Sequence, residues 1–225
     1  MAYALAVVTS APPLQASLFG SHPFALRDSV NGLVETRLDD ACRILHRTHW
    51  IDGADDLFED LHEALPWKTH RRWMVDHEVL EPRLSTSLPE PSHEMRTMAH
   101  ALEALLGRPF IASWANLYRD GSDGVSWHGD RFRPGSKHDD VALVSLGGPR
   151  SFRIRPRGGG ASRLWTLHSG DLLVMSGPIQ QRFEHCIPKA ASAPPRISIA
   201  FRCPRGREFD QAVVDDGRRR VDYRP

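Results

Sequence analysis

The residues of this chain best suited to chemistry are two histidines and one aspartate. His128 and Asp130 form an H-x-D motif, and His185 lies well beyond them in the sequence. Two neutral imidazoles and one carboxylate can hold non-haem Fe(II) on one face and leave coordination positions open on the other. A second H-x-D motif, at His138, lies in a polar stretch expected to be a loop, whereas His128 follows a β-prone run. We therefore predict that His128, Asp130 and His185 are catalytic metal ligands.

Side chains that could hold an anion follow His185. Arg196, Ser198 and Arg202 lie an even number of positions apart, so in a strand they share one face. A buried guanidinium without a partner is costly, and a dicarboxylate would supply that partner through bidentate contacts. Asn116 and Tyr118, again two apart, are suited to hydrogen-bond the same ligand. The pattern favours O₂ activation with 2-oxoglutarate as co-substrate, and a salt bridge within the protein is the alternative for the arginines.

Helical and β-prone segments follow one another along the chain. Apolar spacing predicts helices over residues 38–48 and 54–65, and a third between Ser92 as N-cap and Gly107 as its stop. After Gly107, short β-prone runs alternate with Gly and Pro turns, over residues 111–118, 141–146, 151–155, 164–168, 172–175 and 197–201. This order predicts an α+β fold with a double-stranded β-helix (jelly-roll) core backed by N-terminal helices. A small barrel of this kind would carry His185 back to the H-x-D motif.

Length and composition limit the class of protein. At 225 residues, with a net charge of +1, the chain fits one domain with an N-terminal extension. Its 3 cysteines form no C-x-x-C motif, which fits a reducing compartment and argues against a disulfide framework or a zinc site. The apolar start of the chain lacks a basic region and is too short to span a membrane. We expect a cytoplasmic monomer with no membrane partner.

Positive charge is concentrated beside the proposed metal ligands. From Arg131 to Arg163 there are eight Lys or Arg residues against two acids. A basic segment of this kind favours a polyanionic substrate, with Arg131, Arg133, Arg155 and Arg157 as the candidate nucleic-acid contacts. A solvated charged face is the alternative interpretation.

In this order and at this spacing, the motifs resemble those of the AlkB family of Fe(II)/2-oxoglutarate-dependent nucleic-acid demethylases. The resemblance is carried by Pro82-Arg83-Leu84, Asn116–Gly121, His128–Asp130, Val144–Gly147, Arg150–Phe152, Leu167–Met175, His185–Lys189 and Arg196–Arg202. It implies an Fe(II)-dependent dioxygenase that demethylates N-alkylated bases in DNA, with RNA as a further substrate, and releases formaldehyde and succinate. Such a protein would associate with the nucleoid when it acts on DNA. The resemblance also assigns Fe(II) to His128, Asp130 and His185, and 2-oxoglutarate to Asn116, Tyr118, Arg196, Ser198 and Arg202.

Two positions depart from the pattern of this family. Arg131-Phe132-Arg133 stands where the family often has acidic residues that contact the substrate base, and Ser198 stands where Asn is common. The first departure leaves the preferred lesion open. The sequence also leaves open the choice between single-stranded DNA, duplex DNA and RNA. Two other functions stay open: an oxygenase acting on a protein or a small molecule, and a catalytically silent binding module.

An enzyme that acts on a base must take it out of the stack, so an aromatic or imidazole wall is expected near the metal. His128, Trp73 and Trp127 are the candidates, and core packing is the alternative for the two tryptophans.

Residues 1–30 form an irregular N-terminal arm, residues 31–210 the oxygenase domain and residues 211–225 a polar tail. The arm contains Gln15-Ala16-Ser17-Leu18-Phe19. This segment is similar to the short peptide by which bacterial replication and repair proteins dock on the DNA sliding clamp. Leu18 and Phe19 would fill an apolar pocket there, and packing of the arm on its own domain is the alternative.

Overall fold

Antiparallel sheets make up most of the structure, a computed structural model that describes residues 23–28, 31–74, 77–130 and 139–203. The large sheet has eight strands and the small sheet four, and two short strands pair separately. In order across the large sheet, its strands are β2 (Leu33–Arg37), β3 (Arg43–Arg47), β12 (Asp171–Ser176), β9 (Val141–Gly147), β14 (Arg196–Arg202), β7 (Ile111–Tyr118), β6 (His77–Ser87) and β5 (Lys68–Met74).

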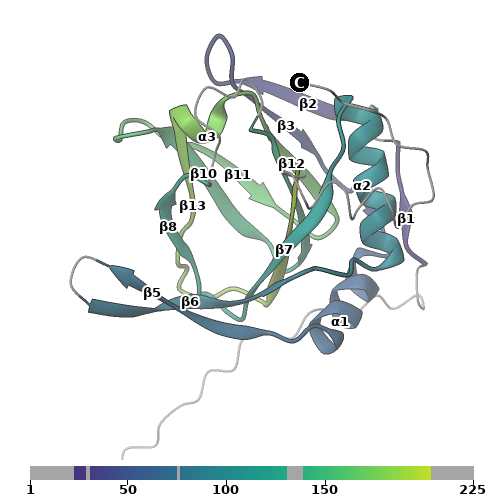
Figure 1. Ribbon diagram of the computed structural model, residues 1–225, viewed down its shortest axis with the longest axis horizontal. Helices are drawn as coiled ribbons and strands as arrows, with labels where there is room; N and C mark the ends of the chain where they lie inside the picture. The colour runs from purple at the N-terminus through teal and green to yellow at the C-terminus, as the bar shows by residue number, and fades with distance from the viewer. Residues whose placement is uncertain (1–22, 29–30, 75–76, 131–138, 204–225) are drawn as a thin grey trace, which may run out of the picture.

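The small sheet runs in the order β11 (Arg163–Leu167), β10 (Arg150–Pro156), β13 (Phe183–Ile187) and β8 (Val125–His128). The separate pair is β1 (Ala25–Leu26) with β4 (Ile51–Asp52), and the helices are α1 (Ala54–Ala64), α2 (His93–Leu106) and α3 (Ile179–Arg182). Figure 1 shows the small sheet facing the large one, with α1 and α2 together on the opposite flank of the large sheet. The predicted jelly-roll core backed by helices is confirmed.

Side chains of the large sheet alternate between two apolar cores. Ile197, Ile199 and Phe201 of β14 are fully buried in the core that also contains the apolar faces of α1 and α2. In β12, Leu172 and Val174 belong to this same core, whereas Leu173 and Met175 belong to the core between the two sheets. Because side chains of a strand alternate in direction, the polar residues of β14 face the space between the sheets.

Two of the three predicted helices are confirmed. α1 ends at Ala64, one position before the predicted stop. Ser92 caps α2 by accepting a hydrogen bond at Oγ from the backbone N–H of Met95, at 3.3 Å. Gly107 ends α2 in the left-handed conformation, at φ 68°, which favours glycine.

The predicted helix over residues 38–48 is wrong, because this segment contains β3. Ile44 and Leu45 are both buried, but Ile44 packs between the sheets and Leu45 packs on the helical side. A strand with apolar residues on both faces gave a spacing that also fits a helix. β3 pairs with β2 on one side and β12 on the other, so tertiary pairing decides its conformation.

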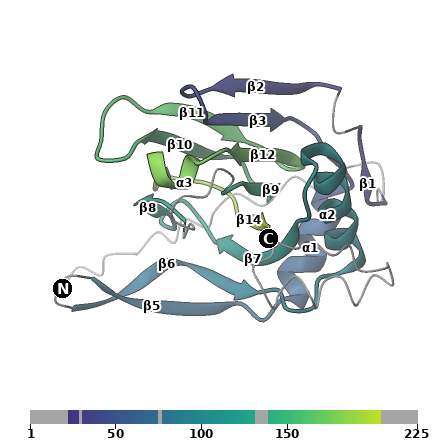
Figure 2. The same ribbon diagram turned by 45° about the horizontal axis from the view of Figure 1, so that its top comes forward.

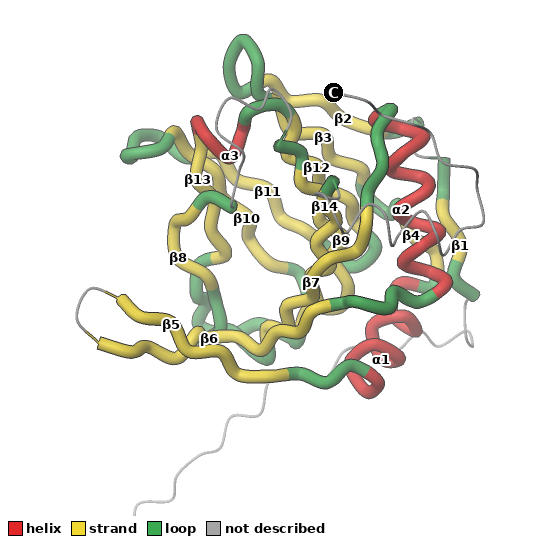
Figure 3. Tube along the Cα trace, in the orientation of Figure 1, coloured by secondary structure: helices red, strands yellow, loops and turns green. Residues whose placement is uncertain are grey.

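The N-terminal half also contributes a long hairpin to the large sheet. β5 and β6 extend beyond the barrel, as Figures 1 and 2 show, and the tube in Figure 3 traces β6 beside its partner strand β7. Within the described part of the chain, no helix has the length and apolar character needed to cross a bilayer.

Several predictions concern residues outside the described part of the chain and stay predictions. They are the clamp-like peptide Gln15–Phe19, the contacts of Arg131 and Arg133, the wall formed by the Trp73 side chain, and the polar tail over residues 211–225.

A buried carboxylate fastens β12 to the turn after β3. Asp171 accepts hydrogen bonds from the backbone N–H groups of His49, at 3.0 Å, and His168, at 2.9 Å. His46 Nε2 lies 3.4 Å from the same carboxylate. Burial alone would raise the pKa of the Asp171 carboxyl, but these hydrogen bonds outweigh it and hold the pKa below its usual range.

We expect Asp171 to contribute to stability at neutral pH. A carboxyl whose pKa is depressed in the folded state stabilises the fold above its unfolded pKa of about 3.9. This contribution is lost as the pH falls from there through the native pKa. Asp171→Asn should lower the free energy of unfolding at pH 7 by about 1–3 kcal/mol and weaken its dependence on acid pH. Urea denaturation at several pH values measures both effects, and an unchanged acid slope would contradict this assignment.

Candidate functional site

Two imidazoles and one carboxylate meet at the edge of the small sheet. β8 and β13 run antiparallel, and their register places His128 directly opposite His185. The two ring centroids lie 4.3 Å apart. Asp130 lies just past the end of β8, which ends at His128. Even so, one candidate ligand atom from each of the three residues lies within 4.8 Å of the other two, as predicted.

The protonation states of these groups suit a metal ion. Burial, helped by His128, lowers the pKa of His185 to about 3 against the opposing charge of Asp130, so this imidazole is neutral at pH 7. Burial would raise the pKa of Asp130, but Arg202 and the two histidines together outweigh burial and lower the pKa. Nδ1 of His128 lies 2.9 Å from the Ser126 carbonyl oxygen. A hydrogen bond donated there leaves Nε2 free to coordinate a metal.

A cavity of about 580 Å³ adjoins these three groups. It is lined by all of the predicted ligand-binding side chains except Arg196, namely Asn116, Tyr118, His128, Asp130, His185, Ser198 and Arg202. Arg196 lies fully buried behind this lining, with its guanidinium carbon 5.3 Å from the centre of the Tyr118 ring. The structure therefore brings together the proposed metal ligands and the proposed co-substrate residues.

The Arg196 guanidinium has hydrogen-bond donors that no described residue satisfies. Its Nε donates to the Ser145 hydroxyl oxygen at 2.8 Å, but Nη1 and Nη2 are buried without a hydrogen-bond partner among the described residues. Burial, with the positive charge of Arg150 in the same direction, lowers the pKa of Arg196 to about 10. A carboxylate would satisfy both nitrogens at once. This observation fits 2-oxoglutarate, since one carboxylate of a dicarboxylate would satisfy these two nitrogens.

The salt bridge considered from the sequence is found at the other arginine. Nη2 of Arg202 lies 3.0 Å from the Asp130 carboxylate, and Nη1 donates to the Ser113 hydroxyl oxygen at 3.0 Å. Arg202 therefore holds a proposed metal ligand in place, whereas Arg196 keeps its binding capacity for a ligand.

Residues 40–202 match the family described as the 2OG-Fe(II) oxygenase superfamily. The chain belongs to this superfamily. Its cofactors are accordingly Fe(II) and 2-oxoglutarate, and the donor set and the buried guanidinium described above fit both groups.

Within the superfamily, the oxygenase is AlkB-like. It is 30% identical over 185 residues to alpha-ketoglutarate-dependent dioxygenase alkB homolog 3 of Homo sapiens, a match that covers 69% of this chain and 65% of the relative. It is 31% identical over 124 residues to DNA oxidative demethylase ALKBH2 of Arabidopsis thaliana, covering 44% of this chain and 40% of the relative. The chain thus spans a little less than two thirds of the length of the human relative.

Solved structures show the same fold at low sequence identity. A prolyl-4-hydroxylase of Pseudomonas putida superposes with a TM-score of 0.52 and 16% identity, covering 72% of this chain and 93% of that one. The structure of OsALKBH1 superposes with a TM-score of 0.53 and 15% identity, covering 76% of this chain and 100% of that one.

The orientation of Asn116 in the oxygenase is set by a residue to which the sequence assigned no role. Arg83 lies in the Pro82-Arg83-Leu84 motif, and its Nε donates to the side-chain oxygen of Asn116 at 2.9 Å. The amide nitrogen of Asn116 is thereby left to donate to a cavity ligand. Glu81 lies 3.0 Å from Nη2 of Arg83 and fixes the guanidinium from behind.

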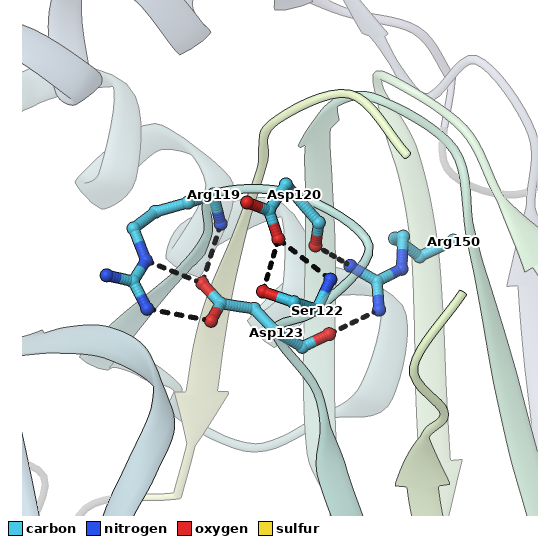
Figure 4. Close-up of polar contacts among 5 residues, drawn as sticks. All are labelled: Arg119, Asp120, Ser122, Asp123 and Arg150. Atoms are coloured by element: carbon cyan, nitrogen blue, oxygen red, sulfur yellow. Dashed lines mark hydrogen bonds and ion pairs between the residues drawn. The ribbon is translucent and has the colours of Figure 1, made fainter. Parts of the chain in front are cut away.

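A polar network holds the turn between β7 and β8 (Figure 4). Arg119 donates from its backbone N–H, Nε and Nη2 to the Asp123 carboxylate, at 2.8 Å each. The buried Arg150 donates to the backbone carbonyl oxygens of Asp120 and Asp123, at 3.0 and 2.6 Å, and to that of Pro188 at 2.8 Å. Because Pro188 directly follows β13, Arg150 ties the start of β8 to the end of its partner strand.

Trp114 is one of the aromatic residues that line the cavity, beside Tyr118 and Phe152, and the sequence interpretation missed it. Its side chain lines the cavity, and its ring centroid lies 5.6 Å from that of His70 on β5. The signal was present in the sequence, because Trp114 is two positions before Asn116 and therefore shares its face of β7. Trp127 instead packs under Arg155, whose guanidinium carbon lies 4.0 Å from the ring centre.

The two described arginines proposed to contact nucleic acid have partners within the protein. Nε of Arg155 lies 2.6 Å from the Glu184 carboxylate. These two residues are cross-strand neighbours, on the face of the small sheet opposite His185. Arg157 donates to the carbonyl oxygens of Gln180 and Gln181, at 2.7 and 3.1 Å. Their nucleic-acid contacts stay predictions, as do those of Arg131 and Arg133.

We expect Arg196→Met to remove the response of the protein to 2-oxoglutarate. Loss of two charge-assisted hydrogen bonds, each worth about 1.5–3 kcal/mol, should weaken co-substrate binding by about 100-fold or more. Without ligand, the variant should melt at the same temperature as the parent or higher. The change removes a buried charge that is not fully hydrogen-bonded, and such a charge is unfavourable in the folded state. Thermal melting with and without 2-oxoglutarate measures both effects.

Arg27→Met is the matched control for this variant, since Arg27 is an exposed arginine paired with Asp52 at 2.6 Å. Its response to 2-oxoglutarate should equal that of the parent. A full ligand-induced rise in melting temperature in Arg196→Met would contradict the assignment of Arg196.

Proposed function

We propose that this oxygenase removes N-alkyl groups from bases of DNA by oxidation, with RNA as a further substrate. The observation that carries the proposal is the unsatisfied Arg196 guanidinium next to a cavity that also contains the His-Asp-His cluster and an aromatic wall. The alkB homolog 3 and ALKBH2 relatives support the choice of a nucleic acid over other substrates.

In this proposal each side chain has a defined task. His128, Asp130 and His185 hold Fe(II), and Arg196, with Asn116, Tyr118, Ser198 and Arg202, holds 2-oxoglutarate. When bound, the metal and co-substrate supply O₂ activation: one oxygen atom enters succinate as CO₂ leaves, and the other hydroxylates the N-methyl carbon. The N-hydroxymethyl product then releases formaldehyde and leaves the repaired base.

The size and lining of the cavity suit a base taken out of the stack. About 580 Å³ lies in the range of pockets that enclose most of a small ligand. Co-substrate and a planar ring can share it if the ring lies along an aromatic wall. Trp114 supplies that wall, and His70, whose Nε2 lies 3.4 Å from the Ser85 carbonyl oxygen, supports the indole from the β5–β6 hairpin.

The direct test is mass spectrometry of N-methylated oligonucleotides after incubation with the protein, Fe(II), ascorbate and 2-oxoglutarate. Single-stranded DNA, duplex DNA and RNA should be compared. We expect each repaired base to lose the mass of one methylene, with an equal amount of formaldehyde formed. Asp130→Ala is the inactive control, because it removes one proposed metal ligand.

Two outcomes would contradict the proposed substrate. Consumption of 2-oxoglutarate without change in any oligonucleotide would indicate an oxygenase for a protein or a small molecule. Failure to consume 2-oxoglutarate under any of these conditions would indicate a silent binding module.

We expect Trp114→Ala to weaken the use of oligonucleotide substrates. Stacking of a base on an aromatic side chain is worth about 1–3 kcal/mol, so KM for the oligonucleotide should rise about tenfold or more. Slow consumption of 2-oxoglutarate without substrate should persist. Trp127→Ala is the matched control, since this indole packs under Arg155. Equal effects of the two changes on KM would contradict the role of Trp114.

A further inference from the structure

α3 is a short helix between β12 and β13 whose buried side chain reaches the proposed metal site. Gln180 is 1% exposed, although a glutamine in a surface connection is ordinarily solvated. Its side-chain oxygen accepts a hydrogen bond from the backbone N–H of Asp130, at 2.9 Å. Its side-chain nitrogen lies 3.6 Å from the Met175 sulfur. Both ends of the amide are therefore engaged, and the side chain is held in one orientation.

The hydrogen bond from Asp130 to Gln180 restrains a part of the backbone that no strand pairing holds. β8 ends at His128, so the backbone at Asp130 has no ladder partner in the small sheet. Arg202 contacts the carboxylate of Asp130 at 3.0 Å, but that contact alone leaves the backbone free to rotate. Gln180 supplies the missing backbone restraint.

α3 is itself fixed by the next hairpin. Arg157 donates to the carbonyl oxygens of Gln180 and Gln181, and its own backbone N–H donates to the Arg182 carbonyl oxygen at 2.8 Å. Gly129 has no side chain and so leaves room for the Arg157 guanidinium beside α3. A Cβ at that position would collide with the Arg157 guanidinium and come within 3.0 Å of the Gln180 carbonyl oxygen.

We propose that Gln180, held in place by Arg157, is a positioning residue for Asp130 and sets the affinity of the site for its divalent metal. The inference rests on the proposed assignment of His128, Asp130 and His185 as metal ligands. Gln180 touches neither the metal nor a substrate. It fixes the backbone of one ligand, so that the carboxylate faces the two imidazoles before the metal arrives.

Gln180→Met tests this, because methionine has a similar volume but lacks the carbonyl acceptor. Groups that orient metal ligands typically contribute about 10–100-fold to metal affinity. We expect the dissociation constant for Mn(II) to rise at least about tenfold. The electron paramagnetic resonance signal of free Mn(II), in protein titrations without substrate, measures it. At saturating Mn(II), affinity for 2-oxoglutarate should change little, because Arg196 lies on another strand.

Gln181→Met is the matched control. Gln181 lies next to Gln180 in α3, but its side-chain nitrogen donates to the Asp139 carboxylate, at 2.7 Å. Its Mn(II) affinity should equal that of the parent. Equal weakening in the two variants would mean that loosening α3 in general is responsible and would overturn the proposal, as would parental Mn(II) affinity in folded Gln180→Met.

Should Gln180→Met show no cooperative melting transition, Arg157→Met decides the question. It removes two hydrogen bonds to α3 and leaves the Gln180 side chain intact, so Mn(II) binding should weaken relative to both the parent and Gln181→Met. Parental affinity in that variant would overturn the proposal. Parent protein that binds no Mn(II) would refute the metal assignment of the proposed function itself, which separates that failure from failure of the positioning role alone.

Discussion

The antiparallel pairing of β8 with β13 is the constraint on which the rest of the site depends. Its register places His128 opposite His185 and so brings the two imidazoles together. A slip by one residue would turn either imidazole to the far face of the sheet. Arg150 stabilises this register, because its guanidinium donates hydrogen bonds both to the turn before β8 and to the residue after β13.

The two arginines near the cavity differ in whether they have a carboxylate partner, and this difference gives them different roles. Asp130 has its countercharge in Arg202, so the proposed metal ligand is kept ionised and in place. Arg196 has no carboxylate partner among the described residues, and its burial is unfavourable in the free protein. The fold tolerates this cost because the core formed by Ile197, Ile199 and Phe201 on the opposite face of β14 holds the strand. Apolar packing on one face of β14 thereby offsets the cost of burying a ligand-binding cation on the other face.

The parts that surround the site differ in how firmly they are held. Strands of the small sheet carry the two imidazoles, strands of the large sheet carry Arg196 and Arg202, and Asp130 lies in the connection after β8. Asp130, beyond its strand, depends on side chains from α3 and β14 instead of a ladder. The β5–β6 hairpin extends beyond the barrel (Figure 2). It brings His70 against Trp114, which lines the cavity. In our proposal, the rigid sheets determine the chemistry, and the hairpin and its aromatic contact determine the substrate.

The sequence by itself determined the jelly-roll class and gave the candidate metal ligands and candidate co-substrate arginines, because residue type and a period of two can be read without knowledge of the tertiary fold. It did not determine β3, since Ile44 and Leu45 face different cores and their spacing also fits a helix. Nor did residue spacing separate Arg196 from Arg202, or Trp114 from Trp127. Partners distant in sequence make those distinctions: Asp130 pairs with Arg202, and Arg155 covers Trp127. Only the folded chain brings such partners together, so only the tertiary structure decided which cation was left for a ligand.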